Sequence, residues 1–124
     1  MPCSILIVDD YAPIRHLLRL CIEQNTDWQV CGEAENGRVA VEKVKQMHPD
    51  MVILDFQMPV MNGLEAARRI SKLALDTAMV MFTTHLNEQL LNDAGAAGIK
   101  DVVSKSDSLV NRLLASLRKI RSEQ

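Results

Sequence analysis

The sequence predicts a doubly wound (βα)5 fold of the α/β class, in which helices cover both faces of a parallel sheet of five strands. Short apolar runs alternate five times with amphipathic stretches, and the connections between them are brief. Alternation of this kind produces a parallel sheet, and right-handed crossovers leave few topologies for it. Among these, the strand order 2-1-3-4-5 is the common solution for five strands.

The predicted strands are runs of apolar residues that are too short for helices and rich in Val, Ile and Met. Strands buried on both faces have this near-continuous apolar character, because helices pack on each side of the sheet. The five runs are residues 4–8, 29–34, 51–54, 78–82 and 102–104.

The predicted helices are the stretches between these runs, where apolar residues recur with helical spacing. The first stripe contains Ile14, Leu17, Leu18, Cys21 and Ile22, at i, i+3, i+4, i+7 and i+8. Similar stripes cover residues 40–47, 64–73, 86–94 and 109–120. Each stripe predicts a helix with one face against the sheet.

Residues typical of helix ends agree with these positions. Pro13 suits the first turn of a helix, and Asn62 followed by Glu65 predicts a capping box. Gly98 is expected to end the fourth helix and Ser106 to cap the last one. We therefore expect residues 1–124 to form one domain, a size that is ordinary for a single core.

Composition excludes several functional classes. The formal net charge is −2 and no block of like charges occurs, which argues against direct nucleic-acid binding by this domain. We find no signal-like segment and no apolar run long enough to cross a membrane. The three cysteines have no metal-like spacing, and we expect Cys21 and Cys31 to be small buried residues in a reducing compartment. A cytoplasmic protein without a membrane partner is the expectation.

Acidic residues follow two of the predicted strands. Asp9 and Asp10 come directly after the first strand, and Asp55 comes directly after the third. In this strand order the ligand crevice lies beyond the carboxyl ends of strands 1 and 3, so the three carboxylates are expected to converge. Thr83 and Lys105 follow strands 4 and 5 and should face the acids at the same edge of the sheet.

Three clustered carboxylates are unfavourable unless a cation neutralises them. A hard divalent cation such as Mg²⁺ suits carboxylate and carbonyl oxygens. One acid can then act as a nucleophile toward phosphorus, while the cation and Lys105 take up charge on the phosphoryl oxygens and Thr83 donates a hydrogen bond. Each residue alone has a simpler explanation as a cap, a turn or a solvated charge, but their convergence in one crevice favours the functional interpretation.

At this point the sequence resembles the receiver domains of bacterial response regulators, over essentially the whole chain. The resemblance rests on Ile-Val-Asp-Asp at residues 7–10, on Asp-x-x-Met-Pro-x-Met-Asn-Gly at residues 55–63, and on Thr83 and Lys105. It implies the flavodoxin-like fold with the strand order given above. Met-Asn-Gly-Leu-Glu-Ala-Ala-Arg-Arg-Ile at residues 61–70 and Lys-Ser-Asp at residues 105–107 are similar to receivers of regulators with a LuxR-type output domain.

The resemblance also implies a magnesium site. Asp10 and Asp55 would bind Mg²⁺ directly together with the main-chain carbonyl of Gln57, and Asp9 would act through a metal-bound water.

A phosphoryl site is implied as well. Asp55 would accept the phosphoryl group, Lys105 would pair with it, and Thr83 would turn inward to it. The donor would be a phosphohistidine on a sensor histidine kinase, or a small phosphodonor. A module of this kind catalyses only its own phosphorylation and dephosphorylation, so it is not an enzyme acting on a diffusing substrate.

The sequence departs from the receiver pattern at two positions. Val102 stands where receivers usually carry Tyr or Phe, so the usual aromatic switch is absent. Ser106 stands where Pro often follows the lysine, which favours a trans bond after Lys105.

Two alternative functions and one partner remain open at this stage. A degenerate receiver would act as an interaction module without phosphorylation. An Asp-nucleophile phosphohydrolase would usually carry a second acid at the position of Gln57. The surface of the fourth helix, fifth strand and fifth helix is a candidate homodimer contact, as in other receivers.

Overall fold

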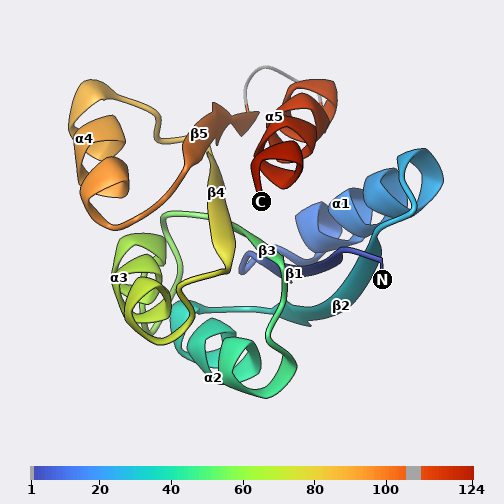
Figure 1. The fold of residues 1–124 in the computed structure, drawn as a ribbon. Helices are drawn as coiled ribbons and strands as arrows, with labels where there is room; N and C mark the ends of the chain where they lie inside the picture. The colour runs from blue at the N-terminus through green and yellow to red at the C-terminus, as the bar shows by residue number, and fades with distance from the viewer. Residues whose placement is uncertain (1, 106–109) are drawn as a thin grey trace.

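The computed structural model describes residues 2–105 and 110–124. Within these residues, five strands alternate with five helices (Figure 1). In order they are β1 Ser4–Val8, α1 Ala12–Asn25, β2 Gln29–Ala34, α2 Gly37–Met47, β3 Met51–Leu54, α3 Gly63–Leu73, β4 Ala78–Thr83, α4 Glu88–Ala96, β5 Asp101–Ser104 and α5 Val110–Glu123.

The strands form one parallel sheet in the order β2-β1-β3-β4-β5, which confirms the predicted fold class and topology. Val8 pairs with Leu54 across β1 and β3, and Thr83 pairs with Ser104 across β4 and β5. Because the carboxyl ends of these parallel strands lie at the same edge of the sheet, the residues that follow them meet there. Two predicted strands were one residue short, since β4 extends to Thr83 and β5 begins at Asp101.

Two apolar layers hold the helices to the sheet. Helices α1 and α5 cover one face, and α2, α3 and α4 cover the other (Figure 1). Along β1, Ile5 and Ile7 pack toward α1 and α5, whereas Leu6 and Val8 pack toward the other layer. This alternation explains why β1, β3 and β4 are apolar at nearly every position.

The predicted helix ends are mostly confirmed. The Asn62 side chain accepts a hydrogen bond from the Glu65 amide at 2.9 Å, so it caps α3 as expected. The Glu65 carboxylate contacts Arg69 at 3.3 Å instead of reaching back to the cap. Gly98 follows α4 with φ +90°, a left-handed conformation that glycine adopts without strain. The predicted cap at Ser106, like the trans bond after Lys105, lies outside the described residues.

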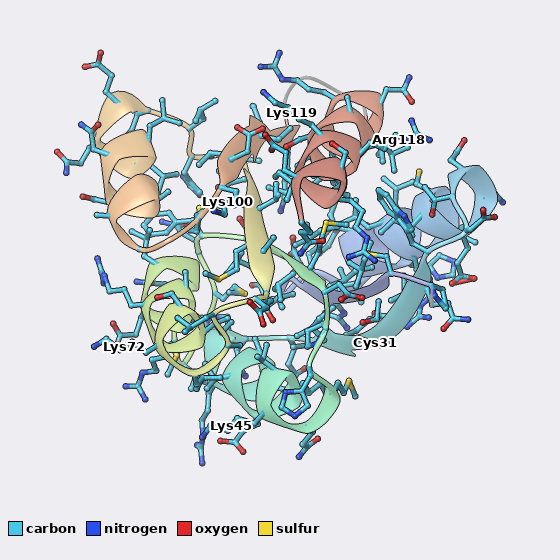
Figure 2. All side chains as sticks on the ribbon, in the orientation of Figure 1. Cys31, Lys45, Lys72, Lys100, Arg118 and Lys119 are labelled. Atoms are coloured by element: carbon cyan, nitrogen blue, oxygen red, sulfur yellow. The ribbon has the colours of Figure 1, made fainter. Side chains whose placement is uncertain are left out.

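Some predicted buried residues are exposed. Leu17 and Leu91 lie on α1 and α4 but are 44% and 46% exposed, and Leu86 precedes α4 altogether. Cys21 and Cys31 are half-buried, contrary to the expectation, and Cys31 lies on the outer strand β2 (Figure 2). These residues have an apolar side chain where the fold provides only a partial cover.

Within residues 2–105 and 110–124, none of the helices combines the length and the apolar character that crossing a bilayer requires.

The basic side chains labelled in Figure 2 project from several different elements, for example Lys45 from α2, Lys72 from α3 and Lys119 from α5.

Candidate functional site

Three carboxylates meet at the carboxyl edge of the central strands. The Asp9 amide donates to the Ala34 carbonyl and the Asp55 amide donates to the Val8 carbonyl, each at 3.0 Å. These bonds extend the strand pairing by one residue and fix both backbones. One oxygen from each of Asp9, Asp10 and Asp55 lies within 4.8 Å of the others. The convergence predicted from the sequence is therefore present.

Lys105 bridges two of the acids. Its Nζ donates to Asp9 Oδ2 at 2.7 Å and to Asp55 Oδ2 at 3.1 Å. The ammonium also lies 5.9 Å from the centre of the Phe82 ring, which belongs to the core beneath it. Because the Lys105 side chain is only 14% exposed, water screens these two ion pairs less than it screens surface pairs.

The remaining oxygens of the buried acids accept main-chain hydrogen bonds. Asp9 Oδ1 accepts from the Tyr11 amide at 2.9 Å, and Asp55 Oδ1 accepts from the Phe56 amide at 2.7 Å. Asp10 differs, because its exposed side chain accepts no hydrogen bond from another described residue. Its carboxylate is therefore free to bind a cation that arrives from solvent.

The environment shifts two pKa values in this cluster. Burial raises the pKa of Asp9 above its usual range, and the hydrogen bonds from Lys105 and Tyr11 offset this only in part. Burial also disfavours the Lys105 ammonium, but the hydrogen bond to Asp9 and the charge of Asp55 outweigh it and raise the pKa of Lys105. One ammonium among three carboxylates leaves an excess of negative charge at the site, which a divalent cation would neutralise.

The β3–α3 loop forms a wall of the site. A cleft of about 490 Å³ is lined by Asp10 together with Gln57 and other loop residues. Gln57 is exposed and lies on the same cleft as Asp10. Carboxylates with an adjacent main-chain carbonyl form the donor set that Mg²⁺ prefers, so the residues present fit this ion.

A close approach of two backbones holds that loop in place. The Gly63 amide donates to the Phe56 carbonyl at 2.7 Å. A Cβ at Gly63 would lie only 2.0 Å from the Asp55 carbonyl oxygen. Glycine is therefore required at this position for α3 to begin directly against the Asp55 backbone.

Thr83 lies at the same edge of the sheet but does not contact the acids. Its buried hydroxyl accepts a hydrogen bond from the His85 amide at 3.1 Å. The His85 ring in turn meets the Phe56 ring edge-on, with the centroids 6.2 Å apart. The loop after β4 is thus connected to the residue that follows Asp55.

Val102 occupies the position of the expected aromatic switch. It lies on β5, half-buried, and packs against the apolar layer of α2, α3 and α4. The position expected for an aromatic switch therefore holds an aliphatic side chain within that layer.

Arg15 is a site residue that the sequence analysis missed. Its Nη1 donates to the main-chain carbonyl of Asp9 at 2.6 Å. One signal for it exists in the sequence, because Arg15 lies in the first turn of a helix, where the helix dipole disfavours a cation. A basic residue at such a position suggests a specific acceptor, and the fold identifies it as the Asp9 carbonyl.

Comparison with known proteins agrees with this geometry. A family model described as the response regulator receiver domain matches residues 5–118. The transcriptional regulatory protein YdfI of Bacillus subtilis is 38% identical over 118 residues, which cover 93% of this chain and 55% of that protein. This chain thus spans about half the length of that relative.

Two solved structures are similar over nearly the whole chain. A two-component response regulator of the LuxR family from Aurantimonas sp. SI85-9A1 has a TM-score of 0.93 at 27% identity, covering all of this chain and 88% of that one. CheY in a CheX-CheY-BeF3-Mg²⁺ complex from Borrelia burgdorferi has a TM-score of 0.84 at 25% identity, covering 94% and 90%.

Fold and site together define a signalling module of the two-component class. The chain belongs to the response regulator receiver domain family, and the resemblance to receivers of LuxR-type regulators is confirmed. Receivers interact with histidine kinases and output domains and bind Mg²⁺ at an acidic pocket, and Asp9, Asp10 and Asp55 form such a pocket here.

Proposed function

We propose that this chain is a phosphoacceptor module in which Asp55 receives a phosphoryl group from a histidine kinase in a reaction that requires Mg²⁺. The observation that carries the proposal is the joint placement of Asp55, two further carboxylates and the Lys105 ammonium at one edge of the sheet. In this proposal residues 1–124 act as one receiver domain, and its binding surface for a partner changes with phosphorylation.

The transfer step uses the Asp55 carboxylate as the nucleophile. An Asp55 oxygen forms a bond to phosphorus as the bond from phosphorus to the imidazole nitrogen breaks, and the electron pair remains on that nitrogen. Lys105 already contacts Asp55 Oδ2 at 3.1 Å, so its charge stands beside the position that the phosphoryl oxygens would take. Attack of water on the same phosphorus restores the carboxylate.

Asp10, Asp55 and the Gln57 carbonyl would hold Mg²⁺, and Asp9 would contact it through water. The bound ion would supply charge neutralisation for the phosphoryl oxygens. Without it, Asp9 and Asp55 share the single charge of Lys105.

Thr83 would respond to the phosphoryl group after transfer. A phosphoryl group on Asp55 would add negative charge and further acceptor oxygens, which would draw the Thr83 hydroxyl inward. That rotation would break the hydrogen bond from the His85 amide, which now holds the loop after β4. Through this loop the change would reach the surface of α4, β5 and α5. We propose that a second copy of the chain binds to that surface.

Incubation with acetyl phosphate and Mg²⁺, followed by intact-mass measurement, tests the proposal. We expect a phosphate-sized mass gain that Asp55→Asn removes. Asp27→Asn is the matched control, since Asp27 is an exposed aspartate outside the site, and it should retain the full gain. Wild-type protein that gains no mass and binds no beryllofluoride would contradict the proposal and favour a phosphorylation-independent interaction module.

The same experiment separates a receiver from a phosphohydrolase. A receiver turns over only its own phosphate, whereas a phosphohydrolase would release phosphate from added small esters at many turnovers per protein. Gln57, where such an enzyme would need a second acid, supports the non-enzymatic assignment.

The cellular setting belongs to the same proposal. The partner is a sensor histidine kinase, and the compartment is the cytoplasm, where the free thiols of Cys3, Cys21 and Cys31 would persist. The formal net charge of −2 and the lack of a block of like charges in the sequence argue against direct nucleic-acid binding by this domain.

A further inference from the structure

Arg15 connects the acidic cluster to a second group of charges on the neighbouring strand. While Nη1 donates to the Asp9 carbonyl at 2.6 Å, Nε donates to Glu33 Oε1 at 3.0 Å. The two donors lie on one planar guanidinium, so the position of Glu33 determines where Arg15 presents its second N–H group. The Arg15 side chain is only 18% exposed, which limits its freedom to move.

Glu33 is itself held from three sides. Its second oxygen, Oε2, accepts from Arg19 Nε at 2.8 Å, and Lys43 Nζ donates to its main-chain carbonyl. Burial works against ionisation, but the hydrogen bonds from Arg19 and Arg15 outweigh it and hold the pKa of Glu33 below its usual range. The carboxylate therefore stays charged at neutral pH and acts as a fixed anchor.

The hydrogen bond from Arg15 to the Asp9 carbonyl also restrains the next residue, Asp10. The Asp9 carbonyl and the Asp10 amide belong to one planar peptide group, so fixing the oxygen fixes the plane from which Asp10 departs. Asp9 is already held by its own amide and by Tyr11, but the Asp10 side chain accepts no hydrogen bond from another described residue. Arg15 thus restrains the peptide plane that precedes the Asp10 Cα, while the Asp9 carboxylate restrains the plane that follows it through the Tyr11 amide.

We propose that Arg15 is a positioning residue, which orients the Asp9–Asp10 peptide so that the Asp10 carboxylate faces a divalent cation. The inference rests on the proposed function, since it concerns the cation site of that function. Arg15 does not contact the cation or the phosphoryl group, and it acts through the main chain.

Electrostatics alone predicts the opposite change in Mg²⁺ affinity when Arg15 is replaced. Arg15 carries a positive charge close to the acids, and removing it would by itself strengthen the binding of a cation. If Arg15 orients Asp10, its removal should instead weaken binding. The direction of the change therefore distinguishes positioning from simple charge repulsion.

The experiment is a titration of the protein with Mg²⁺, followed by NMR through the amide signals of the β1–α1 loop. We expect Arg15→Met to weaken Mg²⁺ binding about tenfold, the low end for loss of an outer-shell partner of a metal ligand. Arg19→Met is the matched control: it removes the same charge and also loses a bond to Glu33, but it does not touch Asp9. Its affinity should stay within about twofold of wild type.

Equal or tighter binding by Arg15→Met would overturn the inference, and so would an equal loss in Arg19→Met. Thermal unfolding without metal shows whether each variant is folded. If Arg15→Met does not fold, Arg15→Lys replaces it in the titration, because lysine keeps the charge but lacks the second N–H edge. Wild-type Mg²⁺ affinity in Arg15→Lys would likewise overturn the inference. Wild-type protein that binds no Mg²⁺ would overturn the proposed function as well, whereas a change confined to Arg15 variants bears on this inference alone.

Discussion

Replacing Gly63 by alanine should damage both the fold and the site, because α3 begins in direct contact with the Asp55 backbone. The added Cβ would lie 2.0 Å from the Asp55 carbonyl oxygen, whereas real Cβ contacts are not below 3.0 Å. The chain must therefore move by about 1 Å, a backbone shift of the overpacking kind that costs roughly 2 kcal/mol. It also weakens the 2.7 Å bond from the Gly63 amide to the Phe56 carbonyl, a further loss of about 1 kcal/mol.

A loss of about 3 kcal/mol corresponds to a decrease of roughly 12 °C in the midpoint of thermal unfolding for a domain of this size. The same displacement moves Asp55, and a misplacement of about 1 Å in a reacting group lowers a rate by about tenfold or more. Differential scanning calorimetry measures the first effect, and the initial rate of Asp55 phosphorylation by acetyl phosphate measures the second.

Gly95→Ala is the control with the opposite expected sign. Gly95 is exposed on α4, and apart from its chain neighbours and the backbone of its own helix nothing lies within 4 Å of the position of its Cβ. Alanine there should raise stability by about 0.5 kcal/mol, because glycine loses more backbone entropy in a helix. A Gly63→Ala protein with the wild-type unfolding midpoint and phosphorylation rate would refute the requirement for a close backbone approach beside Asp55.

Two further outcomes follow from the charges. Mg²⁺ at ten times its dissociation constant should stabilise the wild type by about 1.4 kcal/mol, or roughly 5 °C in the unfolding midpoint. Asp10→Asn should abolish most of that shift. An undiminished shift in the variant would exclude Asp10 as a ligand. Glu33→Gln should lower the free energy of unfolding at pH 7 by about 0.5–1 kcal/mol. The pKa of Glu33 is lower in the folded state than its ordinary value of 4.5. The difference in stability is therefore fully present above pH 4.5 and should be lost as the pH falls through the folded-state pKa. Urea titrations at several pH values measure it, and a difference that does not change with pH would show that the Arg15 and Arg19 contacts are unimportant.

The sequence by itself determined the fold class, the strand order and the positions of the acids. Apolar runs on both faces allow only buried parallel strands, and the acids at residues 9, 10 and 55 come after the two strands that flank the crevice. Local physics is sufficient here, because strand period, helix period and capping are properties of neighbouring residues. The Asn62 cap and Gly98 end were predicted for the same reason.

Which residues of the helix stripes are buried could not be predicted from the sequence alone. Leu17 and Leu91 fit an apolar periodicity, yet both are exposed, because a periodic stripe is wider than the strip of helix that the sheet covers. Cys21 and Cys31 were expected to be buried and are half-buried for a related reason, since α1 and β2 lie at the edge of the sheet.

Only the tertiary structure decided which groups touch within the site. Lys105 and Asp9 are 96 residues apart in the chain, and their 2.7 Å contact depends on the register of four neighbouring strands. The bond from Arg15 to the Asp9 carbonyl involves a main-chain oxygen, which every residue carries and no sequence pattern marks. The hydrogen bond from the His85 amide to the Thr83 hydroxyl and the close approach of Gly63 to the Asp55 carbonyl each involve a main-chain group. The packed chain therefore decides which groups meet.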